Sequence, residues 1–530
     1  MDHKSKSSSS IWTETNSEEK QKPAVTTVLE SPIDEERGVE VSAIGEKPVA
    51  DVALAILDDT NFTYTKEEAK HVSRKIDLVL MPLMALTYMI QYLDKVTLSY
   101  AALFGMNTDT HLHGSQYSWL TTIFYLGYLV AQYPGAYIMQ KTGVRGFLFV
   151  NMFFWSAMVL LMAACHNFSG LATCRFFMGV FEACVSPAFV SITSMWYKRT
   201  EQPARSLFWS SFNGVAAIVG GLINFGVAHI QNEKVPTWKF TFIIIGGASI
   251  IWSVFFFFLF PSNPVTARFL TQRERRIAIE RVRENRTGVE NKIFKREQLW
   301  EALLDPQVWL IVFAIGVWMI TNGIGAFNSI IIEALGGFSK EKTTLMNMPG
   351  GGFMIVFLFF TGLWCNYIRN GRLIIAVFGT WLLILASCLV WKLPSTDPWG
   401  RMVGMWLTYT TPITFVMLLS ISASNIAGYT KKLVVNASIF CFYAVGNIVS
   451  PLLFKSSQKP TYNMGMESML VASIVVCILC LLLMAYYNYE NRRRTKLEEK
   501  ELDAGTGQYK KNEEFMDYTD RQQIAFRYIW

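Results

Sequence analysis

The sequence predicts an all-α integral membrane protein with twelve transmembrane helices arranged in two six-helix halves. Three observations predict this fold class. Only 17% of the 530 residues are charged and 52% are apolar, whereas soluble globular chains carry about 25% charged residues. The apolar residues gather in runs of about 20, which is the length of helix that crosses a bilayer. One polar segment, 261–306, divides six of these runs from the other six.

The expected spans are joined by short connectors, apart from that one long polar segment. The runs long enough to cross a bilayer are 76–102, 116–139, 147–166, 169–196, 206–230, 239–260, 307–332, 344–367, 373–391, 402–428, 433–454 and 468–489. The domain organisation that follows is a disordered cytosolic N-terminal tail at 1–75, a first half at 76–260, a cytosolic linker at 261–306, a second half at 307–489 and a cytosolic C-terminal tail at 490–530.

The tails and the linker are polar in different ways. The first 75 residues hold 15 acids against 10 lysines and arginines and contain no apolar segment of the kind found in a signal peptide. We expect a disordered tail there. The linker is rich in charges of both signs, which favours a solvated helix that joins the halves; a helix lying on the membrane surface is the alternative. The eight cysteines all lie in or beside apolar runs, so no disulfide framework is expected.

The basic residues indicate the orientation in the membrane. If the N-terminus is cytosolic, 25 lysines and arginines fall in or beside the connectors on the cytosolic side and eight on the other side. Positive residues accumulate on the cytosolic side of membrane proteins. We therefore expect both termini in the cytosol, and we assign the net charge of +7 to orientation in a lipid bilayer and not to nucleic-acid binding.

Away from the ends of the predicted spans, four charged residues lie inside the first half: Asp94, Lys95, Arg175 and Glu182. A charge inside the membrane costs several kcal/mol, so each one is a candidate functional residue. Arg175 and Glu182 are seven residues apart, which places them on the same helix face about 10.5 Å from each other. We expect all four to line one cavity; a purely structural clamp between the two helices is the alternative.

The four residue types suit different tasks. Arginine keeps its charge and offers a planar fork of donors, so Arg175 is suited to bind a carboxylate or sulfonate, and Lys95 can assist as a point charge. Glu182 has no cation within one turn of its own helix, which favours it as the proton carrier. Asp94 is either a second proton site or the counter-ion of Lys95.

Weaker candidates are uncharged. Asn213 and Asn425 could donate hydrogen bonds to a substrate, although asparagines inside membranes often only link helices, and the same alternatives apply to Asn322 and Asn447. Gly143 and Arg145 end the connector after the second run, and Gly371-Arg372 repeat this pattern after the eighth. That repeat suggests internal symmetry between the halves, and Gly143 and Arg145 are candidates for a gating loop.

The sequence contains no nucleotide-binding P-loop, no zinc-protease motif and no serine-hydrolase elbow. We therefore expect no enzyme activity, no cofactor and no metal, and an ion gradient in place of ATP as the energy source.

Several strings resemble known families. Leu93-Asp94-Lys95 and the stretch RFFMGVFEA at 175–183 resemble the anion:cation symporter branch of the major facilitator superfamily. The sequence is similar to the fungal allantoate permease family in four further strings: EQPARSLFWSSFNGVAAIVGG at 201–221, RVRENRTG at 281–288, EALLDPQVW at 301–309 and the segment 425–432.

The resemblance implies a twelve-helix transporter that imports a small organic anion with protons, at a fungal plasma membrane. Substrates in such a family include ureides such as allantoate, vitamin carboxylates and dipeptides. The family's roles in substrate binding and proton coupling fall on Asp94, Lys95, Arg175 and Glu182. We expect a monomer from the architecture.

Two positions depart from the family pattern. Lys95 stands where the branch more often has arginine, and Gln140 stands where the superfamily loop usually has an acid. The alternatives to a plasma-membrane symporter are a nutrient sensor with a transporter-like fold and an organic-anion transporter of the endoplasmic reticulum or vacuole.

Overall fold

The computed structural model describes residues 62–198, 201–230, 234–265, 267–283, 295–367, 371–394, 396–459, 462–503, 519–523 and 526–530. All of them belong to one compact unit. The predictions made for residues 1–61, 284–294 and 504–518 lie outside the described residues. The expected disorder of the N-terminal tail therefore stays a prediction.

The first part of the described chain forms helices only. They are α2 (Lys66–Leu103), α3 (Met106–Asp109), α4 (Gln116–Thr142), α5 (Val144–Met162), α6 (Phe168–Glu182), α7 (Val185–Trp196), α8 (Gln202–Ala228) and α9 (Thr237–Leu259), followed in the linker by α10 (Gln272–Arg283) and α11 (Arg296–Leu304).

The second part is helical as well, with several short 3-10 turns. Its elements are α12 (Pro306–Met319), η2 (Ile320–Gly323), α13 (Ile324–Gly336), α14 (Lys340–Met346), α15 (Met348–Tyr367), α16 (Arg372–Lys392), α17 (Pro398–Leu407), η3 (Thr408–Thr410), α18 (Pro412–Asn425), α19 (Tyr429–Val449), η4 (Ser450–Leu453), η5 (Ser456–Gln458) and α20 (Asn463–Asp503).

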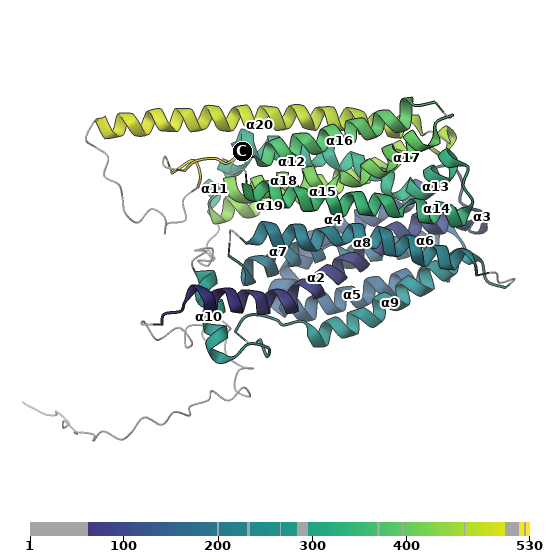
Figure 1. Ribbon diagram of the computed structural model, residues 1–530, viewed down its shortest axis with the longest axis horizontal. Helices are drawn as coiled ribbons and strands as arrows, with labels where there is room; N and C mark the ends of the chain where they lie inside the picture. Colours follow the sequence, from purple (N-terminus) through teal and green to yellow (C-terminus); the bar gives the residue numbers. More distant parts are fainter. Residues whose placement is uncertain are drawn as a thin grey trace, which may run out of the picture. The chain divides into compact units, whose positions relative to one another are not determined.

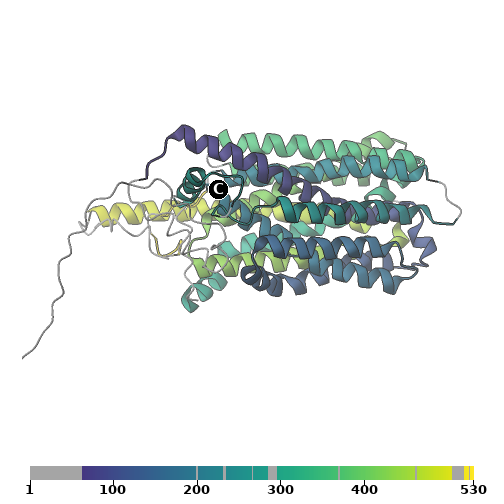
Figure 2. The ribbon, with the colours of Figure 1, turned by 90° about the horizontal axis from the view of Figure 1, so that it is seen from below.

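The long helices run side by side, as Figures 1 and 2 show. In Figure 1 the helices of the first half lie in the lower part of the bundle and those of the second half in the upper part. One end of the bundle carries α10 and α11, and we call it the linker end. The opposite end carries α3 and α14, and we call it the far end.

The predicted membrane fold is confirmed. Among the described residues, eleven helical segments are long and apolar enough to cross a membrane. The remaining predicted run, 116–139, is α4, which has spanning length and packs along α6. Its tyrosines at 117, 125, 128, 133 and 137 lower its hydropathy relative to the other spans. Two spans are longer than expected, because α2 begins at Lys66 and α20 continues to Asp503.

Several spans are interrupted near their middle. The fourth run, expected as one helix, breaks into α6 and α7 directly after Glu182. Pro187 explains the break, because it has no N–H to bond the carbonyl of Ala183 four residues earlier. Instead, Gln132 of α4 donates to that carbonyl at 3.1 Å. A neighbouring side chain thus satisfies the freed backbone group, as burial in a membrane requires.

The two halves touch mainly through α2 with α13, α4 with α19, and α8 with α14 and α15. Near the far end, Ser99 Oγ accepts from the Ser329 N–H at 3.0 Å, and Tyr117 Oη donates to the Ala326 carbonyl at 2.5 Å. Midway along α8, Gly214 faces Gly351 of α15 so closely that a Cβ on Gly214 would lie 2.6 Å from the Gly351 oxygen. Glycine is required at this crossing because only backbone fits there.

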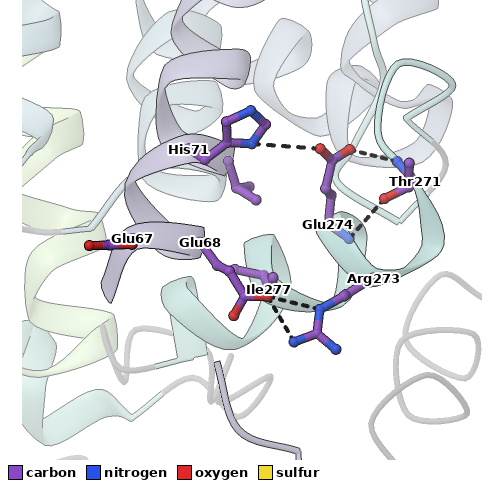
Figure 3. Close-up of a pocket in the computed structure, with 8 residues that line it drawn as sticks. Glu67, Glu68, His71, Thr271, Arg273, Glu274 and Ile277 are labelled. Atoms are coloured by element: carbon purple, nitrogen blue, oxygen red, sulfur yellow. Dashed lines mark hydrogen bonds and ion pairs between the residues drawn. The ribbon is translucent and has the colours of Figure 1, made fainter. Parts of the chain in front are cut away.

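The linker helix α10 is bound to the first half. Glu274 accepts from Lys75 Nζ at 2.7 Å, and Arg281, which is buried, pairs with Glu201 at 2.8 Å. Figure 3 shows a cavity of about 390 Å³ between α2 and α10, crossed at one side by the pair of Arg273 with Glu68. The buried side of α10 packs on protein, whereas the sequence favoured a solvated helix.

Candidate functional site

The four charged residues predicted inside the membrane lie in the first half, on α2 and α6. Asp94, Arg175 and Glu182 are almost completely buried, and 28% of the Lys95 side chain is exposed. Lys95 Nζ lies 2.7 Å from Glu182 Oε1, so α2 and the last residue of α6 are joined by an ion pair. The cation that Glu182 lacks within one turn of its own helix is therefore supplied by the neighbouring helix α2.

Gln91 completes this pair. Its Nε2 donates to the same Glu182 Oε1 at 3.0 Å, one turn of α2 before Lys95. Glu182 Oε2 is buried and has no hydrogen-bond partner among the described residues. Glu182 therefore ends α6 at the break of the helix with one oxygen bound and the other open.

Asp94 points away from its chain neighbour. Its Oδ2 accepts a hydrogen bond of 2.6 Å from Trp155 Nε1 of α5, and Oδ1 accepts a long one of 3.5 Å from Ser249 of α9. The sequence left open whether Asp94 is the counter-ion of Lys95. The geometry places the two side chains in different contacts, because Lys95 is joined to Glu182.

Arg175 is the least satisfied of the four. Its side chain is buried, and its Nη1 lies 3.9 Å from the sulfur of Met178. Its Nε and Nη2 have no acceptor within the described part of the chain. Arg175 interacts electrostatically with Tyr117, Glu182 and Asp94. A buried guanidinium with open donors is costly, so an anion that accepts from it would gain strongly.

Aromatic side chains from both halves surround the Lys95 ammonium. It lies 5.9 Å from the Phe124 ring centre, and the Phe124 ring packs on Tyr125 and Tyr128 of α4, which in turn pack on Tyr443 of α19. The Tyr128 and Tyr443 rings are 6.0 Å apart. The exposed part of Lys95 therefore belongs to a place where the two halves meet, which is where transporters of repeated architecture bind substrate.

The four predicted asparagines make different kinds of contact. Asn213 of α8 has an Oδ1 with no hydrogen-bond partner among the described residues, so it retains an open acceptor within that part of the chain. Asn322 donates to Asn447 at 2.8 Å and links two helices of the second half. Asn425 lies at the linker end of α18, where its amide is bonded to the backbone of Ile529. Asn425 is therefore not brought together with the four charged residues.

The predicted gating loop is a tight turn between α4 and α5. Gly143 adopts φ +79°, a conformation that side chains strongly disfavour. Arg145 Nε donates to the Phe257 carbonyl at 2.7 Å, and its guanidinium lies 4.7 Å from the Phe257 ring centre. This contact places a cation at the C-terminal end of α9. The counterpart Gly371 has φ −115°, so the repeated sequence does not form the same turn.

Two site residues were missed from the sequence, namely Gln91 and Trp155. Gln91 stands four residues before Lys95, and this spacing on one helix face could have identified it. Trp155 could not have been found, because its indole reaches Asp94 only in the folded bundle, where α5 and α2 both pack on α9.

A family model described as Major Facilitator Superfamily matches residues 84–451. The chain belongs to the major facilitator superfamily. Its relatives include an uncharacterized transporter of Schizosaccharomyces pombe, 52% identical over 479 residues, which cover 90% of this chain and 91% of the relative. Allantoate permease of Saccharomyces cerevisiae is 32% identical over 88% of this chain and 87% of its own. The thiamine pathway transporter THI73 of the same yeast is 30% identical over 89% of each chain.

These relatives confirm the resemblance to the fungal allantoate permease family and place this major facilitator among transporters, not enzymes. The fold is also found in the crystal structure of a bacterial homolog to the human lysosomal transporter Spinster, in an inward-facing and unoccupied conformation. That structure aligns with a TM-score of 0.53 and 13% identity over 80% of this chain and 97% of the other.

Proposed function

We propose that this major facilitator is a proton-coupled symporter that imports a small organic anion by alternating access. The observation that carries the proposal is the buried Arg175, whose Nε and Nη2 have no acceptor among the described residues. A permanent cation with open donors inside a membrane protein calls for an anionic ligand. A carboxylate such as that of allantoate, of a vitamin or of a dipeptide has the required fork of acceptors.

The ion pair between Lys95 and Glu182 supports coupling to protons. Lys95 is held by Glu182 at 2.7 Å. A proton on Glu182 removes the charge that holds Lys95, and the ammonium is then free to join Arg175 in binding the anion. Loss of the proton lets Glu182 recapture Lys95, which weakens anion binding. Binding of the anion and protonation of Glu182 therefore favour each other, and the anion and the proton are released together.

The position of the site supports alternating access. Lys95 and Glu182 belong to the first half, whereas Tyr443 belongs to the second. Rotation of one half against the other changes the distance between Tyr443 and Lys95, so the site can be closed from either side in turn. The linker end faces the cytosol in this proposal, which places both termini there, in a plasma membrane.

Uptake of a labelled panel tests the proposal. Cells that express the chain at their surface are given allantoate, nicotinate, pantothenate, biotin, a dipeptide and a sulfonate, at acidic and at neutral external pH, with and without a protonophore. We expect one compound to accumulate faster in acid and the protonophore to abolish the accumulation. Accumulation that depends neither on the external pH nor on the protonophore would contradict proton coupling.

Two controls separate the alternatives. Arg175→Ala should abolish uptake, whereas Arg492→Ala, an exposed arginine on the distal part of α20, should leave it unchanged. Surface expression without uptake of any compound would favour a sensor, and an internal location would favour an organellar transporter.

A further inference from the structure

Residues 519–530, of which 519–523 and 526–530 are described, lie against the second half at the linker end; we call them the strap. Figure 1 shows the last described residues, marked C, at that end of the bundle. The strap contacts α11, the connection between α18 and α19, and α20. The sequence assigned this region to a cytosolic C-terminal tail.

A buried charge cluster holds the first part of the strap. Lys431 in the first turn of α19 is fully buried, and its Nζ donates to Glu301 at 2.9 Å, to Asp305 at 2.7 Å and to Asp520 of the strap at 2.7 Å. Gln307 of α12 also donates to Asp520, at 2.7 Å. One lysine therefore joins the linker, the second half and the strap.

Two asparagines bind the strap backbone from two helices. Asn425 of α18 accepts from the Ile529 N–H at 2.9 Å and donates to the Ile529 carbonyl at 2.7 Å. Asn491 of α20 makes the same two bonds with Tyr528, each at 2.9 Å. Such paired amide bonds recognise main chain in a defined position, as a peptide-binding site does.

Arg494 of α20 binds three carbonyls of the strap. Its Nη1 donates to Asp520 at 2.8 Å, to Phe526 at 3.0 Å and to Gln523 at 3.1 Å. Its guanidinium also lies 4.5 Å from the ring centre of Tyr528, whose hydroxyl donates to Asp520. The Arg494 side chain is buried by these contacts.

We infer that α11, α18, α19 and α20 form a binding site for a peptide, and that the strap is its ligand. Occupancy adds a second attachment of α11 to the second half. Gln298 and Glu301 of α11 already bind the start of α19, and Thr519 of the strap donates to Glu301 at 2.8 Å while Asp520 shares Lys431. The part of the linker on α10 is bound to the first half instead. The strap therefore reinforces the attachment of α11 to the second half.

The charge balance predicts how the strap can be released. Carboxylate oxygens of Glu301, Asp305 and Asp520 all lie within 4.8 Å of one another. Without the Lys431 ammonium, the three carboxylates outnumber Arg521 of the strap, whose Nη2 lies 3.3 Å from Asp305, and they repel one another. Glu301 and Asp305 belong to a packed helix and to a helix junction, whereas Asp520 belongs to the strap. Lys431→Met should therefore eject the strap while the helices remain folded.

A peptide-binding experiment tests the inference. A chain ending at residue 518 is purified and titrated with a synthetic peptide of residues 519–530. We expect saturable binding, weakened about tenfold or more by Asp520→Asn in the peptide, because a hydrogen-bonded buried charge pair is worth several kcal/mol. Gln522→Ala is the control, since Gln522 bonds only within the strap. Equal binding of all three peptides, or no binding, would overturn the inference.

Hydrogen exchange in the full chain provides a second measurement that does not depend on the truncated form. The Tyr528 and Ile529 amides should exchange slowly. The double variant Asn425→Ala with Asn491→Ala should accelerate both, and Lys431→Met should also accelerate α11. Unchanged exchange of α11 when the strap is released would show that the strap does not fix the linker. Neither readout requires transport, so the inference stands apart from the proposed function.

Discussion

The Asp94 carboxylate accepts a hydrogen bond of 2.6 Å from the Trp155 indole, and this bond turns Asp94 away from Lys95, its neighbour in the chain. Two adjacent charges on α2 therefore serve different helices: Asp94 is held by α5, and Lys95 is held by α6. Asp94 is thus bonded to the neutral donors Trp155 and Ser249, whereas Glu182 is paired with the Lys95 ammonium.

Trp155→Phe should destabilise the protein by about 1–3 kcal/mol, because a buried carboxylate loses its best donor. Thermal unfolding of the purified protein in detergent measures this loss. The double variant with Asp94→Asn should lose much less than the sum of the two single variants. Strict additivity would show that the bond contributes nothing.

Glu182→Gln should abolish proton-driven accumulation and leave exchange of substrate across the membrane intact. The amide keeps the shape of the side chain but can neither carry the proton nor hold Lys95 by charge. Uptake and counterflow in proteoliposomes, with the accumulated compound of the panel as the probe, measure the two activities. Accumulation that persists would remove Glu182 from proton coupling.

Arg175→Met should abolish anion binding while leaving thermal stability equal or raised. Replacing a buried charge by an apolar side chain of similar length removes a desolvation cost of several kcal/mol that the present contacts do not offset. Binding of the labelled anion and thermal unfolding are measured on the same sample. A large loss of stability would instead assign Arg175 to a structural role.

The pair of Lys75 with Glu274 should weaken in acid. Burial raises the pKa of Glu274, but hydrogen bonds from Lys75 and the Thr271 backbone outweigh this and hold the pKa below its ordinary value of 4.5. The stabilisation is therefore present above about pH 4.5 and disappears as the pH falls through the lowered pKa. A double-mutant cycle with Lys75→Met and Glu274→Gln should give below about 1 kcal/mol at neutral pH, since Lys75 is partly exposed, and nothing in strong acid. A coupling that is unchanged in acid would contradict the assignment.

Gly143→Ala should cost about 1–2 kcal/mol, because a side chain disfavours the left-handed turn at this position. Gly146→Ala, three residues later in α5, is the matched control: a Cβ there meets nothing within 4 Å, and alanine favours the helix. Thermal unfolding should therefore separate the two variants in opposite directions. Equal effects would show that the turn does not depend on glycine.

Apolar run length and the placement of charge were sufficient to predict the membrane-spanning runs of this fold. The cost of intramembrane charge drew attention to Asp94, Lys95, Arg175 and Glu182, of which Lys95 and Glu182 are paired, and their role in transport stays a prediction. Pairing was harder to predict, because partners such as Trp155 for Asp94 come from helices that only tertiary packing brings together. Pro187 is a local sequence signal for the helix break after Glu182. The hydrogen bond from Gln132 of α4 to the freed Ala183 carbonyl could not be predicted, because it depends on the packing of another helix. Binding of the strap could not be predicted from the sequence, because its contacts join residues more than 200 positions apart in the chain, such as Glu301 and Asp520.

The crossing of Gly214 with Gly351 has a mechanical consequence. At this crossing the two backbones touch, with the Ile218 and Ile355 side chains beside them, so few side chains have to change rotamer when the helices turn against each other. The contact can act as a pivot whose resistance is set by van der Waals forces, while the interlocked side chains elsewhere along the seam separate and re-form. A single methyl group added at this crossing would push α8 and α15 apart and remove the pivot without touching any charged residue.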